Sequence, residues 1–422
     1  MRLRKVFVLM LTVVMMVMSL AACGTSTTPA EKTKIVYWHT YTDAHEEALK
    51  KVIDGFNASQ DKYEVVGEQQ PYSEFDTKLL QAVRNGTGPD LTTMYPSDAV
   101  GYINEGLLTD FKPFIAKSQG GVDALKNSIP AGLYAELTQW GDNIYSYPMT
   151  STGEVLFYNK TLFDKYGIAA PQTWTDVANY SKLIYEKEGI PGFGTDSVTD
   201  TYQCLLMQAG SSYIDAASKK LAIDETIGKQ KLNWFADGVK AGYFRLVGED
   251  TYFSNPFGSQ AVASYIGSSA GISYVLSAVN NAFEVGCVPI PQEGPVKYIS
   301  QWCSGFVCFS KDQTKAEGVY EFLKYFATTD VVVEWAIHFG SIPVFADAQK
   351  DAKFVEYEKS NIAIKALSEE IQYVGMLPGI TGAKTVRTEI DKMVQNVALG
   401  VMDTDAAYAA FVTAAQTALD GK

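Results

Sequence analysis

The sequence predicts an α/β protein in which the chain passes repeatedly between strands and helices. Short apolar runs, typical of buried strands, alternate with segments whose apolar residues recur every three or four positions. With 47% hydrophobic and 20% charged residues, the composition is that of a soluble globular protein. No glycine-rich linker divides the 422 residues. Two lobes that share several chain crossings therefore fit better than two sequential domains.

The first third of the chain predicts three strands separated by two helices. Strands are expected at 35–38, 63–66 and 91–95. The first helix carries the apolar stripe Leu49, Val52, Ile53 and Phe56, and the second carries Leu79, Leu80 and Val83. Asp43 and Glu46 have the spacing of a capping box for the first helix. This alternation predicts a mainly parallel sheet.

The rest of the chain continues the alternation. Further strands are expected at 155–158, 262–266, 286–289 and 305–309. Thr173 or Thr175 caps the next predicted helix. A later helix over 315–327 buries Val319, Phe322, Leu323 and Phe326, and the segment 385–419 is helical by its pattern.

The N-terminus has the pattern of an export signal. Arg2, Arg4 and Lys5 precede an apolar run over 6–20, and small residues follow. The run is shorter than the roughly 20 residues that a spanning helix needs, although an uncleaved anchor helix is the alternative. We therefore interpret residues 1–22 as a signal peptide.

The segment Leu20-Ala21-Ala22-Cys23-Gly24 resembles the bacterial lipobox. That resemblance implies lipid attachment at Cys23, which would anchor the exported protein to the membrane surface. Residues 23–32 are polar, as expected of a flexible tether. The folded part would then begin near residue 33.

Charge and cysteine content exclude several classes of partner. The formal charge is −13, and without the three cations of the signal peptide it is −13 − 3 = −16, so nucleic acid is excluded as a partner. Four further cysteines, Cys204, Cys287, Cys303 and Cys308, allow three full pairings, and both disulfides and buried thiols remain open. Their spacing matches no zinc motif, and we expect neither a metal nor a cofactor.

Five short landmarks follow one another along the chain: Tyr37-Trp38-His39 with Phe56-Asn57, Gly88-Pro89-Asp90 with the segment 106–111, Tyr158-Asn159-Lys160-Thr161-Leu162-Phe163 with Gly167, Pro171-Gln172-Thr173-Trp174, and Gly340-Ser341-Ile342-Pro343-Val344. Taken in this order, they resemble the family 1 extracellular solute-binding proteins of bacterial ABC importers. Each piece is short, but together they span nearly the whole mature chain.

The resemblance implies a two-lobe periplasmic-binding-protein-like fold of type II that closes over a solute. The chain would cross between lobes near Pro148, Tyr298 and Gly340. Lobe one would hold 33–148 and 299–340, and lobe two would hold 149–298 and 341–422. The implied role is capture of a sugar or polyol by an extracytoplasmic, membrane-anchored protein, expected to be a monomer, that delivers it to an ABC permease.

The resemblance leaves the solute open. In glycerol-3-phosphate-binding members, site residues fall on Tyr72, Ser151, Ser268 or Ser269, and Arg387. Two departures weaken that match, since Pro96-Ser97 replaces an acid and Ser341 replaces a tyrosine. In maltose-binding members, contacts fall on Tyr95 and Asp98, but a stacking aromatic falls near Ala383.

Residues at the carboxyl ends of the predicted strands supply the groups that a sugar needs. Sugars take aromatic faces and polar groups that hydrogen-bond hydroxyls. The candidates are Trp38, His39, Tyr95, Asp98, Ser151, Thr152 and Trp302. Asp98 could instead cap a helix, Trp38 could be core, and Arg387 could be a surface charge. We favour a carbohydrate or polyol, with a phosphorylated polyol or phosphodiester as the alternative.

A serine hydrolase is the competing enzyme class. The segment Gly267-Ser268-Ser269-Ala270-Gly271 matches G-x-S-x-G, with Ser269 as nucleophile, and Asp312 or Asp330 and then His338 follow in hydrolase order. No His-Gly-Gly segment for an oxyanion hole precedes it. We therefore expect a binding protein and no enzyme.

Overall fold

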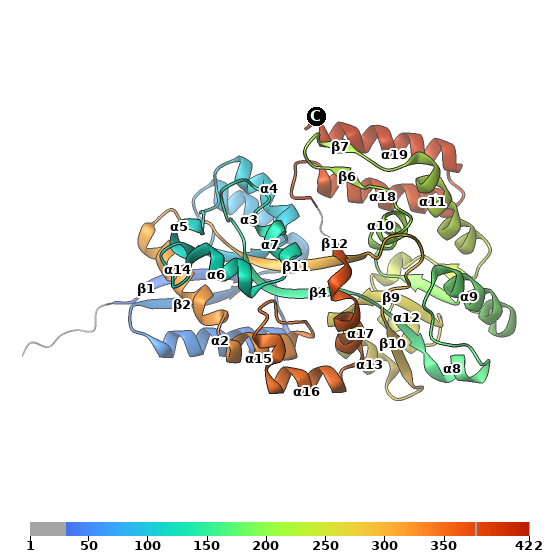
Figure 1. Ribbon diagram of the computed structural model, residues 1–422, viewed down its shortest axis with the longest axis horizontal. Helices are drawn as coiled ribbons and strands as arrows, with labels where there is room; N and C mark the ends of the chain where they lie inside the picture. Colours follow the sequence, from blue (N-terminus) through green and yellow to red (C-terminus); the bar gives the residue numbers. More distant parts are fainter. Residues whose placement is uncertain (1–30, 376–377, 422) are drawn as a thin grey trace, which may run out of the picture.

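A computed structural model describes residues 31–375 and 378–421, without the side chains of Gln301 and Trp302 (Figure 1). The predicted signal peptide, Cys23 and nearly all of the predicted tether lie outside the described residues. None of the helices in the described ranges is long and apolar enough to cross a membrane.

One ten-stranded sheet runs through the molecule, and two strands, β4 and β11, cross its middle (Figure 1). The main strand order is β2 (Tyr63–Gln69), β1 (Thr33–His39), β3 (Leu91–Met94), β11 (Ile299–Cys308), β4 (Tyr147–Asn159), β9 (Ser264–Ser268), β5 (Phe193–Thr195) and β8 (Phe244–Arg245). β10 (Val285–Val288) also pairs with β4, and β12 (Val374–Gly375) with β11.

The sheet is parallel toward its two ends and antiparallel at its centre. β1 pairs in parallel with β2 and β3, and β5 with β8 and β9. β11 is antiparallel to both β3 and β4, and β4 is antiparallel to β9 and β10. The prediction of a mainly parallel sheet is therefore wrong at the centre. There the chain leaves one lobe along β4 and returns along β11, which makes the two strands antiparallel.

The half of the molecule around β1, β2 and β3 is called lobe one here. Its helices are α2 (Asp43–Ser59), α3 (Phe75–Arg84), α4 (Pro96–Asn104), α5 (Lys112–Ile115), α6 (Gly121–Ser128), α7 (Ala131–Leu137), α14 (Gln313–Phe326) and α15 (Thr329–Phe339). The predicted apolar stripes of α2 and α14 are buried. The predicted capping box is wrong, because Thr42 is the N-cap and no side chain caps the helix.

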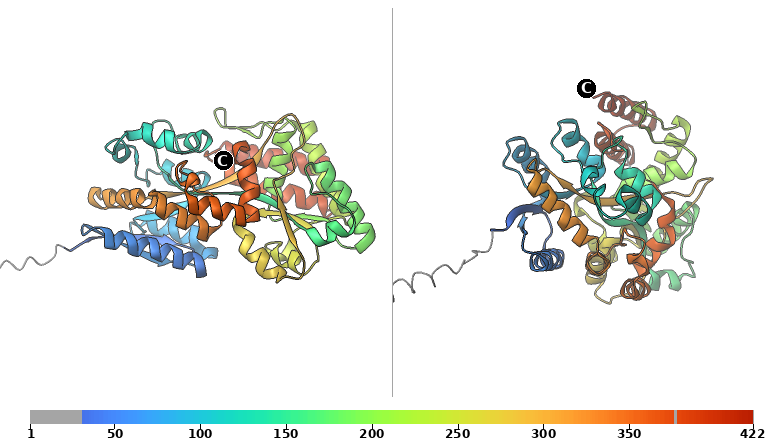
Figure 2. Two further views of the ribbon diagram at one scale, coloured as in Figure 1. Left: turned by 60° about the horizontal axis from the view of Figure 1, so that its bottom comes forward. Right: turned by 60° about the vertical axis from the view of Figure 1, so that its left-hand side comes forward.

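The half around β5, β8 and β9 is called lobe two. Its helices are α8 (Lys160–Lys165), α9 (Trp174–Glu188), α10 (Val198–Gln208), α11 (Glu225–Lys240), α12 (Ser254–Gly258), α13 (Ile272–Val279), α17 (Ile362–Glu370), α18 (Ala383–Ala398) and α19 (Thr404–Leu419). α16 (Ala352–Ser360) contacts both α17 and α15 of lobe one. Thr173 caps α9 in a capping box with Asp176, which decides between the two predicted caps. Helices lie on both faces of the sheet (Figure 2).

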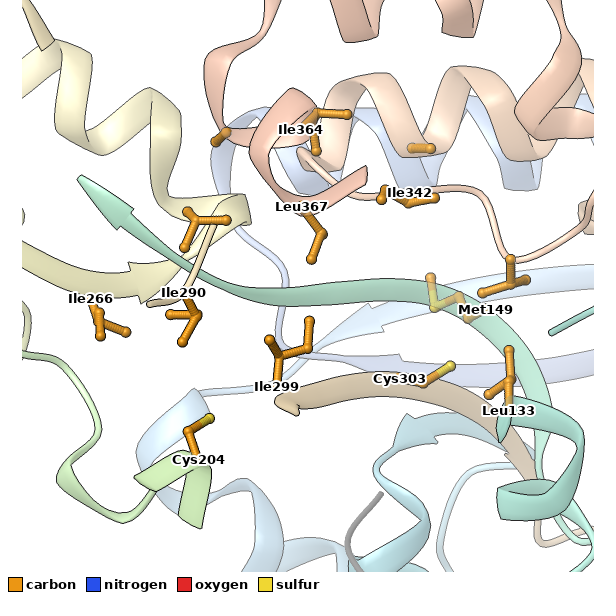
Figure 3. Close-up of a cluster of buried hydrophobic side chains, with 14 of the residues drawn as sticks. Leu133, Met149, Cys204, Ile266, Ile290, Ile299, Cys303, Ile342, Ile364 and Leu367 are labelled. Carbon is orange, nitrogen blue, oxygen red and sulfur yellow. The ribbon is translucent and has the colours of Figure 1, made fainter. Parts of the chain in front are cut away.

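β4 is buried along its whole length, and the described side chains of β11 are buried except for half-buried Ser304, so the crossing strands join the two lobes through a continuous core. All 13 residues of β4 are buried. In Figure 3, Met149 of β4 and Leu133 of α7 lie close to Cys303 of β11, and Ile299 lies at the start of β11. The four described cysteines are free thiols. Burial raises the pKa of the Cys204 and Cys303 thiols, which keeps both thiols protonated.

Candidate functional site

A cleft of about 1030 Å³ lies between the two lobes. Lobe one contributes the loop after β1, the short helix η1 (Tyr72–Glu74), α3 and α4. Lobe two contributes Tyr252, Tyr274 of α13 and the segment 380–384. Thr150 and Thr152 of β4 and Ser304 of β11 also line it. The crossing strands thus contribute hydroxyl-bearing side chains to the cleft wall.

Tyrosines are the most frequent aromatic residues in the cleft wall. They are Tyr41, Tyr72, Tyr95, Tyr102, Tyr252 and Tyr274. Tyr72 is 80% exposed, Tyr252 58% and Tyr274 60%. Large aromatic faces left open inside a concave site offer stacking surface to a ligand and a hydroxyl for a hydrogen bond. The exposed rings come from both lobes, so one ligand could contact both.

Tyr41 is held in place by an aromatic cluster beneath the cleft. The Tyr41 ring meets Trp335 edge-on at 5.4 Å and Phe339 at 5.7 Å, measured between centroids. It stacks with His39 at 6.0 Å. Burial raises the pKa of Tyr41 to about 12, so its hydroxyl stays protonated at neutral pH. The Tyr41 hydroxyl donates to Met149 Sδ at 3.6 Å, which leaves its oxygen to accept a hydrogen bond from a ligand.

Tyr252 is held by the residue that follows it. The backbone N–H of Phe253 donates to Asp196 Oδ1 at 2.6 Å, and the Phe253 ring stacks on Tyr265 at 5.8 Å. Burial raises the pKa of Asp196 to about 7. The loop that carries Tyr252 is thus anchored to the core of lobe two.

The two described cations that line the cleft are both paired with carboxylates. Arg84 Nε donates to Glu105 Oε2 at 2.8 Å. Lys384 Nζ lies 3.1 Å from Asp98 Oδ1 and 3.0 Å from Asp76 Oδ2. His45 also lines the cleft, and burial lowers its pKa, which favours the neutral imidazole. An anionic ligand would therefore have to compete with carboxylates for these cations.

Four predicted site residues, Tyr72, Tyr95, Asp98 and Thr152, line the cleft. Tyr95 is the N-cap of α4 and Asp98 lies in its first turn, so Asp98 does not occupy the capping position. A carboxylate in the first turn is stabilised by the helix dipole. Burial raises the pKa of the Tyr95 hydroxyl, which remains protonated.

Trp38 and His39 are not among the described residues that line the cleft. Trp38 is 8% exposed, its Nε1 donates to Glu68 Oε2 at 2.9 Å, and Lys78 Nζ lies 5.2 Å from its ring. His39 is buried, and burial lowers its pKa. The backbone of Trp302 pairs with Thr152, and its side chain lies outside the described part of the structure.

Most of the residues suggested for a phosphate ester are not among the described residues that line the cleft. Arg387 Nη1 and Nη2 each lie 2.9 Å from the carboxylate of Asp200. Ser151 is buried, and its backbone forms an isolated antiparallel β-bridge with Ile342. Ser268 is exposed, and its Oγ accepts from the Ala270 N–H at 3.3 Å. Of this predicted group, which also includes Ser269, Tyr72 alone is among the described residues lining the cleft.

The residues of the hydrolase hypothesis make separate local contacts. Ser269 is fully buried, and its Oγ has no hydrogen-bond partner among the described residues. His338 Nδ1 lies 2.7 Å from the Glu334 carbonyl oxygen. Asp312 caps α14 by accepting from the Lys315 N–H at 3.0 Å. Within the described ranges, no three His, Cys, Asp or Glu side chains form a group that could hold a metal ion.

Several lining residues were not among the predicted ones, notably Tyr41, Asp76, Tyr252, Tyr274 and Lys384. Tyr41 lies two residues beyond the end of β1, so the rule that selected Trp38 could also have selected it. Tyr274 stands out as the exposed aromatic ring of α13, whose other large side chains are aliphatic. Asp76 and Lys384 meet only through the tertiary fold, which also brings Tyr252 into the same cleft wall.

The chain matches a protein-family model and is similar to known binding proteins. A family model described as bacterial extracellular solute-binding protein matches residues 51–362. The sn-glycerol-3-phosphate-binding periplasmic protein UgpB of Brucella abortus (strain 2308) is 24% identical over 344 residues, which cover 78% of this chain and 79% of that protein.

Two solved structures share the fold. The cyclic alpha-maltosyl-1,6-maltose binding protein from Arthrobacter globiformis has a TM-score of 0.79 at 21% identity, covering 93% of this chain and 100% of that one. UgpB from Mycobacterium tuberculosis, in complex with glycerophosphocholine, has a TM-score of 0.78 at 18% identity, covering 92% and 99%. The two-lobe fold predicted from the sequence is thereby confirmed.

Proposed function

The chain belongs to the bacterial extracellular solute-binding proteins, and we propose that it captures a neutral carbohydrate or polyol for the permease of an ABC importer. One observation carries the choice of solute. The cleft between the lobes is lined by tyrosines, and its described cations are already paired with its own carboxylates.

A neutral sugar matches the chemistry of this wall. The C–H face of a sugar ring can lie against the exposed rings of Tyr72, Tyr252 and Tyr274. Its hydroxyls can donate to the carboxylates of Asp76 and Asp98, and charge-assisted bonds of this kind are the strong ones. Thr150 and Thr152 can exchange hydrogen bonds with further hydroxyls.

A glycerol phosphate ester is the second candidate. It is supported by the curated relatives, which are named as sn-glycerol-3-phosphate-binding proteins, and by Lys384, whose ammonium lines the cleft. A phosphate would have to displace Asp76 and Asp98 from Lys384. It would also place about two further negative charges beside these carboxylates. This electrostatic cost makes the ester the less favourable solute.

We also propose the lobe boundaries near residues 148, 298 and 340 as the hinge. Support comes from β4, whose early residues pair with β11 and whose later residues pair with β9 and β10. A bend within β4 and β11 would move the lobes with little change inside each. The isolated bridge between Ser151 and Ile342 supports a third crossing that lies beside the first.

We further propose that the protein is a monomer anchored by lipid at Cys23 and has no catalytic role. The lipobox-like sequence supports the anchor, and loss of acyl labelling in Cys23→Ala would test it. Family membership and the full burial of Ser269 support a binding role without catalysis. Light scattering of the purified protein tests the monomer.

A thermal-shift screen of the mature protein tests the proposed function. A solute that binds the folded state stabilises it by RT ln(1 + [L]/Kd), about 2.7 kcal/mol at a hundred times Kd. We expect neutral mono- or oligosaccharides or polyols to raise Tm, and glycerol-3-phosphate to leave it unchanged. A shift with glycerol-3-phosphate alone would contradict the choice of solute.

A further inference from the structure

A short segment of lobe two lies against lobe one beside the cleft. Residues 379–384, called the strap here, join the region after β12 to α18. The Gly379 carbonyl accepts from Trp140 Nε1 at 3.1 Å, and its N–H donates to Gln139 Oε1. Asn104 Nδ2 donates to Thr381 Oγ1 at 3.1 Å. The strap therefore touches lobe one at more than one place.

Lys384 is the charged residue of the strap. Its ammonium lies 3.0 Å from Asp76 of α3 and 3.1 Å from Asp98 of α4. Burial lowers the pKa of Lys384, but Asp98 and Asp76 outweigh this and raise it, so the lysine is charged across the physiological range. One cation thus bridges two carboxylates that belong to the other lobe.

The strap is fixed to lobe two one turn further along α18. Arg387 binds Asp200 of α10 through two 2.9 Å contacts, and Asp200 is buried. The same Asp200 carboxylate accepts from Ser300 Oγ at 2.7 Å, at the start of β11. Because Arg387 ties α18 to α10, the contacts of Lys384 connect lobe one to the body of lobe two.

We propose that Lys384 is a positioning residue for solute capture, which bridges Asp76 and Asp98 and so holds the lobes closed. This inference rests on the proposed function, because closure matters only if a solute is enclosed. Lys384 also fixes the Asp98 carboxylate at the cleft wall, where a sugar hydroxyl could reach it.

The strength of the bridge suits a reversible clamp. The side chains of Lys384, Asp76 and Asp98 are 64%, 80% and 30% exposed. Exposed ion pairs are weak and are screened by salt over about 8 Å at physiological ionic strength. Losing two of them should shift the closed-to-open ratio by about threefold to tenfold. Such a bias favours closure without trapping the solute.

Small-angle scattering of the ligand-free mature protein tests the bridge. We expect Lys384→Met to enlarge the radius of gyration at low salt and to remove its dependence on salt, whereas the wild type should expand as salt is added. Lys384→Arg should behave like the wild type. Lys392→Met is the matched control, because Lys392 lies on the same helix and pairs with Glu389 within lobe two at 2.6 Å.

A second variant guards against an indirect effect of the lysine change. Asp76→Asn combined with Asp98→Asn should give the same expansion as Lys384→Met. If Lys384→Met keeps the wild-type radius and salt response, the proposal is wrong. This readout needs no solute. Failure of every carbohydrate to bind would therefore count against the proposed function while leaving the bridge intact.

Discussion

Arg387 and Asp200 form a bidentate ion pair inside lobe two, with both contacts at 2.9 Å. Burial raises the pKa of Asp200, but the Arg387 guanidinium outweighs this effect and holds that pKa below its ordinary value. The arginine that the family resemblance assigned to a phosphate is thus bound by a carboxylate of the chain itself.

Arg387→Ala should therefore cost stability, because it leaves Asp200 buried without its cation. Breaking a buried pair by removing one partner typically costs about 3–5 kcal/mol. We expect a loss of this order in urea unfolding, with partial recovery when Asp200→Asn is added to Arg387→Ala. Unchanged stability, combined with loss of phosphate-ester binding, would return Arg387 to the binding site.

Asp98→Ala should weaken solute binding. Asp98 lines the cleft and presents a carboxylate that can accept from sugar hydroxyls. Removing a charge-assisted hydrogen bond typically costs about 1.5–3 kcal/mol, or roughly tenfold to a hundredfold in Kd. Calorimetry with the solute found by screening would measure this. Wild-type affinity in Asp98→Ala would place the solute elsewhere in the cleft.

Periodicity in the sequence predicted the local elements well and the long strands poorly. The apolar stripes of α2 and α14 could be recognised in the sequence because each helix buries one face. β4 was predicted at 155–158 but covers Tyr147–Asn159, and β11 begins at Ile299 rather than at 305. The early part of β4, Met149-Thr150-Ser151-Thr152-Gly153, is polar yet buried on both faces, so neither alternation nor an apolar run marks it.

The site was predictable only where it follows directly from a strand. Tyr95 and Asp98 come just after β3, and the rule that ligands bind at the carboxyl ends of strands selects them. The approach of Lys384 to Asp76 joins segments 308 residues apart and leaves no local trace. For the same reason the sequence could not reveal that Arg387 is paired with Asp200.

Glu136 should make the protein less stable as pH rises. This residue of α7 is 6% exposed, and burial raises its pKa from 4.5 to about 8. The folded state therefore binds the proton more tightly than the unfolded state. The stability that this gives is present below about pH 4.5 and is lost as pH rises toward 8.

Glu136→Gln should remove this loss. We expect it to raise the free energy of unfolding at pH 8 by up to a few kcal/mol, and to change it little at pH 4.5. Asp123→Asn, at an exposed acid of α6, is the control. Urea unfolding of each variant at the two pH values provides the comparison. Equal effects of Glu136→Gln at both pH values would contradict the buried, protonated carboxyl.

Ser269 should not react as a nucleophile. Its side chain is fully buried, and no hydrogen-bond partner holds its Oγ among the described residues. We expect no covalent labelling of the wild type by a fluorophosphonate probe and no esterase activity that Ser269→Ala removes. Stoichiometric labelling at Ser269 would revive the hydrolase hypothesis.

The most direct test of the proposed capture of a neutral solute is calorimetric titration of the mature protein with glycerol-3-phosphate and with a panel of neutral mono- and oligosaccharides and polyols. The paired cations and open tyrosine faces of the cleft predict saturable binding of at least one neutral solute and no measurable binding of the phosphate ester. Tight binding of glycerol-3-phosphate with no response to any neutral solute would contradict it.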